Sequence, residues 1–134
     1  MPEFLFDKDE RGETAIDRGL EAVRYKPLSK PIRFFVGGCV ERGDGSSFRR
    51  KAHAHNGERS DPYFGWICIR SHRRVLTPRG QPSRLVWHEV AHILTRQGHT
   101  ARWREMAVAL GVPRIEADSY IRKPKLLPEA ETRE

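Results

Sequence analysis

The residues best suited to chemistry are His88, Glu89 and His92, which form a His-Glu-x-x-His pattern. On a helix, positions four apart lie one turn above each other, so the two histidines direct their imidazoles to one place with Glu89 beside them. Zinc prefers nitrogen or sulfur donors in a tetrahedron, and a catalytic zinc keeps its fourth position for water. The pattern therefore predicts a zinc site with its own general base, and this site needs a third protein ligand.

Three residues compete for the place of the third ligand. His99 is the nearest in sequence, and it follows Gly98 at the expected end of the helix, where a turn can bring it back toward the metal. Glu105 and Glu116 are the rivals, because some enzymes with this pattern use a later glutamate. The glycine-histidine pair favours His99, so the predicted ligands are the two motif histidines and His99.

The side chains around the motif are uncharged, as a buried helix that carries a desolvated metal requires. They are Leu85, Val86, Trp87, Val90, Ala91, Ile93 and Leu94. The other interpretation of the pattern is a pair of partly buried histidines in an ordinary core.

The motif helix is expected to run from about Arg84 to Arg96, with Ser83 as its N-cap and Gly98 as its left-handed stop. Thr100 is the expected N-cap of the following helix, which ends at Gly111. Upstream, the apolar residues Ile16, Leu20 and Val23, at i, i+4 and i+7, predict an amphipathic helix from Thr14 to about Tyr25. Strands are expected over residues 32–36, 48–54 and 63–69, and a last helical turn or two over residues 116–122.

These elements predict one α+β domain: an N-terminal helix, a short and mostly antiparallel sheet, the motif helix and a following helix. Residues 1–12 are expected to form a flexible arm, residues 13–122 the domain, and residues 123–134 a disordered tail rich in proline and charge. With 134 residues, 37% apolar and 32% charged, the domain has a small core.

No stretch approaches the roughly twenty apolar residues of a membrane span, and the first residues lack the organisation of a signal peptide. A cytoplasmic monomer without membrane contact is therefore expected. In such a chain Cys39 and Cys68 are expected to be reduced thiols rather than a disulfide.

The chain carries 25 basic and 18 acidic residues, a net charge of +7, and most of the basic residues are arginine. Arginine suits phosphate, so DNA is an expected partner, contacted through segments such as Arg49-Arg50-Lys51 and Arg73-Arg74. A solvated basic face explains the same charge without any partner.

Several patterns together resemble the SprT-like metallopeptidases, a zincin family that includes the Spartan proteases. They are Gly65-Trp66-Ile67-Cys68-Ile69, His88-Glu89-Val90-Ala91-His92, Gly98-His99 and Trp103, within about Tyr63 to Gly111. The resemblance implies a small zincin-like fold, zinc held by the three histidines, and Glu89 as general base. The cysteine-rich zinc ribbon of many family members has no counterpart here, so a minimal form from a bacterium or a phage is expected.

Site chemistry and resemblance together predict a zinc-dependent endopeptidase that acts on protein or peptide substrates, including DNA-associated proteins. Zinc activates a water molecule, and Glu89 accepts its proton and later protonates the leaving amine. An extended substrate is expected to add to a sheet edge at the segment ending Arg70-Ser71-His72. The candidates for stabilising the oxyanion are His72, Tyr63, Arg102 and Tyr120.

Two other functions stay open. One is a zinc-containing nucleic-acid-binding or interaction protein without turnover, and the other is a zinc amidase or deacylase, whose usual motifs are spaced differently. His53 and His55 alternate so that they face one side of an expected strand. They indicate a second metal site or, more simply, polar positions that face solvent.

Overall fold

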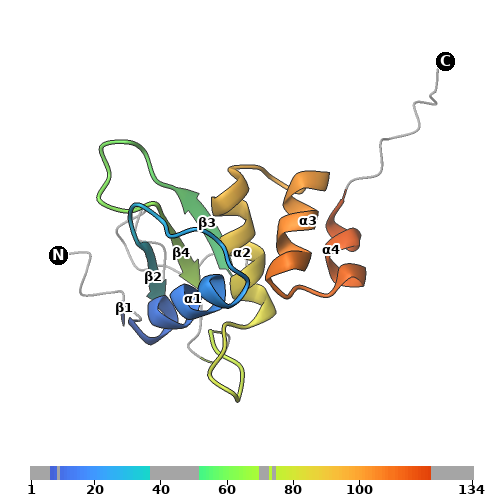
Figure 1. The fold of residues 1–134 in the computed structure, drawn as a ribbon, viewed down its shortest axis with the longest axis horizontal. Coiled ribbons are helices and arrows are strands. Elements are labelled where there is room, and N and C mark those ends of the chain that lie inside the picture. The colour runs from blue at the N-terminus through green and yellow to red at the C-terminus, as the bar shows by residue number, and fades with distance from the viewer. Residues whose placement is uncertain (1–6, 9, 37–51, 70–72, 74, 122–134) are drawn as a thin grey trace.

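In the part of the chain that the structure describes, a small sheet and four helices make up the fold (Figure 1). The computed structural model describes residues 7–8, 10–36, 52–69, 73 and 75–121. The helices are α1 (Glu10–Ala22), α2 (Arg84–Thr95), α3 (Ala101–Leu110) and α4 (Arg114–Tyr120). The strands are β1 (Asp7–Lys8), β2 (Ile32–Val36), β3 (Ala52–Asn56) and β4 (Gly65–Ile69). The α+β class predicted from the sequence is confirmed.

The sheet has the strand order β1-β2-β4-β3 and is mixed. The outer pairs, β1 with β2 and β3 with β4, are antiparallel, as expected, but the central pair of β2 and β4 is parallel. β3 lies on the other side of β4 from β2 and runs opposite to both of them. Among the described strands, β3 therefore forms one edge of the sheet, and β4 is interior.

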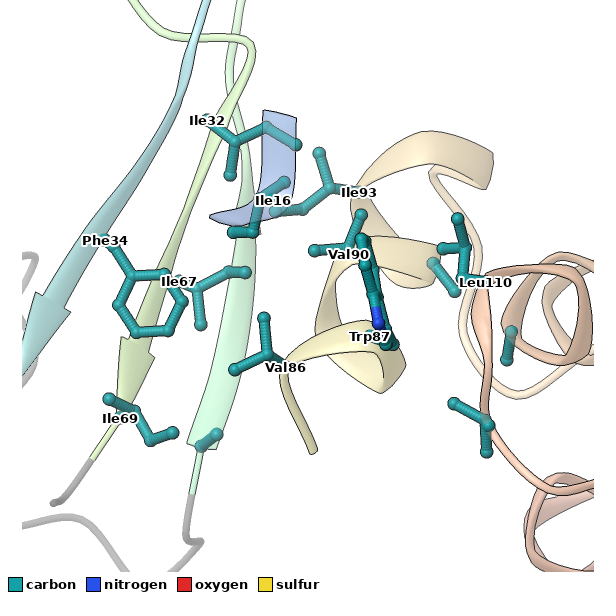
Figure 2. Close-up of a cluster of buried hydrophobic side chains, with 14 of the residues drawn as sticks. Ile16, Ile32, Phe34, Ile67, Ile69, Val86, Trp87, Val90, Ile93 and Leu110 are labelled. Atoms are coloured by element: carbon teal, nitrogen blue, oxygen red, sulfur yellow. The ribbon is translucent and has the colours of Figure 1, made fainter. Parts of the chain in front are cut away.

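The core lies between the sheet and α2. Alternate residues of β2 are buried, so one face of that strand points inward, as the two-residue period of a strand requires. Figure 2 shows Val86, Val90 and Ile93 on the side of α2 that faces the sheet residues Phe34 and Ile67. All five side chains are at most 1% exposed, and burial of each stabilises the fold by about 1.5–3 kcal/mol.

The first helix begins and ends earlier than predicted. It spans Glu10–Ala22 instead of Thr14 to about Tyr25, and Val23, counted in the predicted apolar stripe, lies beyond it and is 44% exposed. The side chain of Glu13 accepts a hydrogen bond from the backbone N–H of Phe34 at 3.1 Å. This contact ties the first turns of α1 to β2, a tertiary effect that the periodicity of the helix does not report.

The remaining elements lie close to their predicted positions. β2 has the predicted bounds, β4 is the C-terminal part of the expected strand 63–69, and α4 begins two residues before the expected 116–122. Residues 1–6, 48–51 and 122–134, which include most of the expected arm and all of the expected tail, lie outside the described residues. The expected arm also contains β1 and the start of α1. No helix in the described ranges is long and apolar enough to cross a bilayer.

Candidate metal centre

The helix α2 carries the motif and is buried on several sides. Ser83 caps it as predicted, since its hydroxyl accepts a hydrogen bond from the backbone N–H of Val86 at 3.3 Å. One side of the helix packs on the sheet, and Trp87 lies on another side, toward α3 (Figure 2). The motif residues His88, Glu89 and His92 line a pocket of about 820 Å³. Because the helix packs on the sheet on one side and through Trp87 on another, its orientation is fixed, and the motif residues on the remaining side face the pocket.

The turn after α2 differs from the prediction. Arg96, not Gly98, adopts the left-handed conformation that ends the helix, with φ 56° and ψ 33°. This conformation costs a residue other than glycine about 1–2 kcal/mol. The guanidinium of Arg96 compensates by donating to the carbonyl of Gly57 at 3.0 Å, and it lies 5.6 Å from the centre of the Phe64 ring. The end of α2 is thus anchored to the loop between β3 and β4.

The three predicted zinc ligands meet in the structure. The Nε2 atom of His99 lies 3.1 Å from Nε2 of His88 and 3.2 Å from Nε2 of His92. Zinc–nitrogen bonds of about 2.0–2.1 Å in a tetrahedron place two ligand nitrogens about 3.3 Å apart. The observed spacing fits this value, so the three imidazoles can hold one metal ion.

A hydrogen bond to the backbone selects the tautomer of His92. Its Nδ1 lies 2.7 Å from the carbonyl oxygen of Gln97, and a carbonyl oxygen only accepts, so Nδ1 is the donor. In the neutral ring, Nε2 then keeps its lone pair. Metal-binding histidines commonly have this arrangement, in which an outer partner holds the other ring nitrogen.

His88 is kept neutral by its surroundings. Burial, with smaller contributions from charge on His92 and His99, lowers the pKa of His88 from 6.5 to about 3. Neutral imidazole is the form that binds metals, so His88 is ready to act as a ligand at neutral pH. The indole N–H of Trp103 donates to the carbonyl oxygen of His88 at 3.1 Å and holds this part of α2 against α3.

Glu89 is only 6% exposed and lines the same pocket as the three histidines. Burial removes the water shell of a carboxylate, and this raises the free energy of the folded state unless another group compensates. Its place in the pocket of the three histidines makes Glu89 the candidate for a base that takes a proton from water.

The rivals for the third ligand lie elsewhere. The carboxylate of Glu105 is exposed and binds the guanidinium of Arg114 at 3.1 Å and that of Arg104 at 3.0 Å. Glu116 pairs with Arg84 at 3.2 Å. The structure thus brings His99, and neither glutamate, to the motif.

Of the four candidates for the oxyanion stabiliser, Tyr120 lies at the pocket. Its ring centre is 4.6 Å from that of His88, and it lines the pocket with the histidines. Tyr63 packs under Arg33 instead, 5.1 Å from the guanidinium carbon to the ring centre. Arg102 is exposed and does not line the pocket, while His72 lies outside the described residues.

The sheet edge beside the centre is not the one predicted from sequence. The prediction placed the substrate at the segment ending Arg70-Ser71-His72, but β4, which leads into that segment, pairs on both sides. Residues 70–72 lie outside the described residues. The edge strand β3 lines the pocket through Ala52, His53, Ala54 and Asn56. Sequence reasoning missed β3 because strand order is set by tertiary pairing.

The basic segments expected to contact DNA fall mostly outside the described residues, which include Arg73 but not residues 49–51 or Arg74. Binding to DNA therefore stays a prediction.

Comparison of the chain with protein-family models, with curated proteins and with solved structures found no match. We therefore infer a function from the residues and geometry of the centre.

Proposed function

We propose that this protein is a zinc-dependent endopeptidase of the SprT-like, zincin type. In this proposal His88, His92 and His99 hold the zinc ion and Glu89 is the general base. The observation that carries the proposal is the convergence of three imidazole nitrogens, 3.1 and 3.2 Å apart, in a pocket that also contains a buried carboxylate. Three protein ligands and a fourth position for water are typical of catalytic zinc.

The chemistry is divided between the metal and the side chains around it. When bound, zinc acts as a Lewis acid that lowers the pKa of a coordinated water to about 7 and polarises a carbonyl oxygen. Glu89 accepts the proton of the attacking water and donates it to the amine that leaves. The phenol of Tyr120 donates a hydrogen bond to the oxygen that becomes negative in the transition state.

The edge strand β3 supplies a place for the substrate. A peptide in extended form can add to a sheet edge, where main-chain hydrogen bonds align it. Because β3 lines the pocket together with His88 and Glu89, a peptide bound along β3 would lie next to the metal and the base. The pocket of about 820 Å³ has room for the residues on either side of one peptide bond.

We further propose DNA-associated proteins as substrates, on the basis of the net charge of +7. A positive surface binds phosphates without reading sequence and brings the enzyme to proteins on the same DNA.

The test compares wild type with Glu89→Gln in zinc content and in cleavage of casein, with and without DNA. The amide keeps the shape of the side chain but cannot accept a proton at neutral pH, so cleavage is lost while zinc and fold are retained. Glu105→Gln is the matched control, since Glu105 is exposed and outside the pocket, and it should cleave as wild type does. Equal cleavage by wild type and Glu89→Gln contradicts the mechanism. DNA binding by a wild type that cleaves nothing supports a binding protein without turnover.

A further inference from the structure

A second group of metal-ligand side chains lies on the sheet, formed by His53 and His55 of β3 and Cys68 of β4. The register places His53 directly opposite Cys68. Residues opposite each other in an antiparallel pair project from the same face, and so does a residue two positions along, here His55. Alternate residues such as Ala54 and Ile67 pack into the core. The three side chains therefore project from the sheet face opposite to Ala54 and Ile67, and His53, on the edge strand, also borders the pocket of the motif histidines.

The donor atoms of this group are close enough to share one ion. The imidazole nitrogens and the Cys68 sulfur all lie within 4.8 Å of one another. Around a tetrahedral zinc, ligand nitrogens lie about 3.3 Å apart and a nitrogen and a sulfur about 3.5 Å apart. These spacings are shorter than the 4.8 Å limit, so binding of an ion would draw the three side chains closer together. Cys68 is fully buried, whereas His53 and His55 are half-buried, so an ion can reach the group from the histidine side.

Ring contacts hold the two imidazoles in place. His55 stacks on Trp66, with ring centres 5.0 Å apart and planes 19° apart. His53 meets His55 edge-on at 4.6 Å. Contacts that orient ligand side chains raise metal affinity, because less rotational freedom is lost on binding. A buried cysteine alone is explained as a small apolar side chain, but two oriented imidazoles at its sulfur complete a ligand set that apolar packing does not require.

We propose that His53, His55 and Cys68 form a second metal site, of the thiolate–imidazole kind that takes zinc. Thiolate and imidazole donors favour zinc over magnesium or calcium, which prefer oxygen. Binding converts the Cys68 thiol to the thiolate, so one proton is released to solvent for each ion bound. The ion joins β3 to β4 and thereby fastens the edge strand that lines the pocket. This site does not depend on the proposed protease activity.

Cobalt(II) distinguishes the two centres, because a cobalt–thiolate bond gives a near-ultraviolet charge-transfer band that cobalt bound by histidines alone does not give. We titrate the reduced, metal-free full chain with Co²⁺ and then displace it with Zn²⁺, counting metal by native mass spectrometry. Wild type should bind two ions per chain and show the band. Cys68→Ala should lose the band and one ion, while His99→Ala should lose one ion and keep the band.

Two further variants keep the test decisive. Cys39→Ala removes the other cysteine of the chain and should leave the band unchanged. His55→Ala changes a half-buried side chain and should lose the band even if Cys68→Ala, at a fully buried position, folds poorly by circular dichroism. The proposal is overturned if wild type shows no band at saturating Co²⁺, or if the band survives in Cys68→Ala or His55→Ala. Failure of His99→Ala to lose an ion counts against the proposed protease centre alone.

Discussion

The cluster of His88, His92 and His99 is built along one helix and the turn that follows it, whereas the cluster of His53, His55 and Cys68 is built across two strands. In the first, the spacing of four residues on α2 aligns two of the histidines, and an anchored turn adds the third. In the second, the pairing of β3 with β4 brings the two histidines and the cysteine together.

The two clusters also differ in what surrounds them. The helix cluster shares a pocket of about 820 Å³ with a buried carboxylate and with the ring of Tyr120, so it has room for a substrate and a base. The strand cluster has a buried thiol and a stacked tryptophan. The pocket and the buried carboxylate favour the proposed chemistry at the helix cluster. The position of the strand cluster between β3 and β4 favours the proposed stabilisation of the sheet edge.

The largest expected effect is the loss of zinc from the helix cluster in His99→Ala. This change removes one of three protein ligands, so affinity should fall by more than the roughly 10–100-fold that an outer partner contributes. Competition with a chelator measures the affinity. Glu105→Ala and Glu116→Ala are the controls and should bind zinc as wild type does, because both carboxylates pair with arginines away from the pocket. Zinc loss in a glutamate variant instead of His99→Ala would reassign the third ligand.

The next effect, on turnover and not on zinc binding, is expected for Tyr120→Phe, which removes a phenol at the pocket and leaves the ring. Loss of one hydrogen bond to an oxyanion lowers kcat by about 100- to 1000-fold. Zinc content should not change. Tyr63→Phe removes a phenol that lies under Arg33, away from the pocket, and should keep wild-type kcat. Equal kcat values for the two variants would remove Tyr120 from the mechanism.

The smallest effect separates the tryptophans of the two clusters. Trp103→Phe leaves the buried carbonyl of His88 without its indole donor, which should lower the free energy of unfolding by about 1–3 kcal/mol. In Trp66→Phe the lost indole N–H has no hydrogen-bond acceptor among the described residues. No free energy of unfolding should therefore be lost through a broken hydrogen bond. Urea unfolding of the metal-free variants measures both. A larger loss of unfolding free energy in Trp66→Phe than in Trp103→Phe would show that its tryptophan stabilises the strand cluster more than Trp103 stabilises the helix cluster.

Much of the helix cluster could be predicted from sequence because its determinants are local. A cap at Ser83, a helical repeat and a short turn decide where His88, His92 and His99 lie, and each of these depends on residues close in the chain. The exact stop of α2 could not be predicted, because the left-handed Arg96 is stabilised by Gly57 and Phe64, which are distant in sequence.

By itself, the sequence determined the α+β class, the bounds of β2 and most of α2, and which three histidines meet in the helix cluster, because periodicity and capping act within a few residues. Only the tertiary structure decided the strand order, the parallel central pair, the position of Tyr120 at the pocket and the meeting of Cys68 with two histidines. The physical reason is register. A shift of one residue between β3 and β4 would turn Cys68 to the other face from His53, and register is set by the core that all the elements bury together.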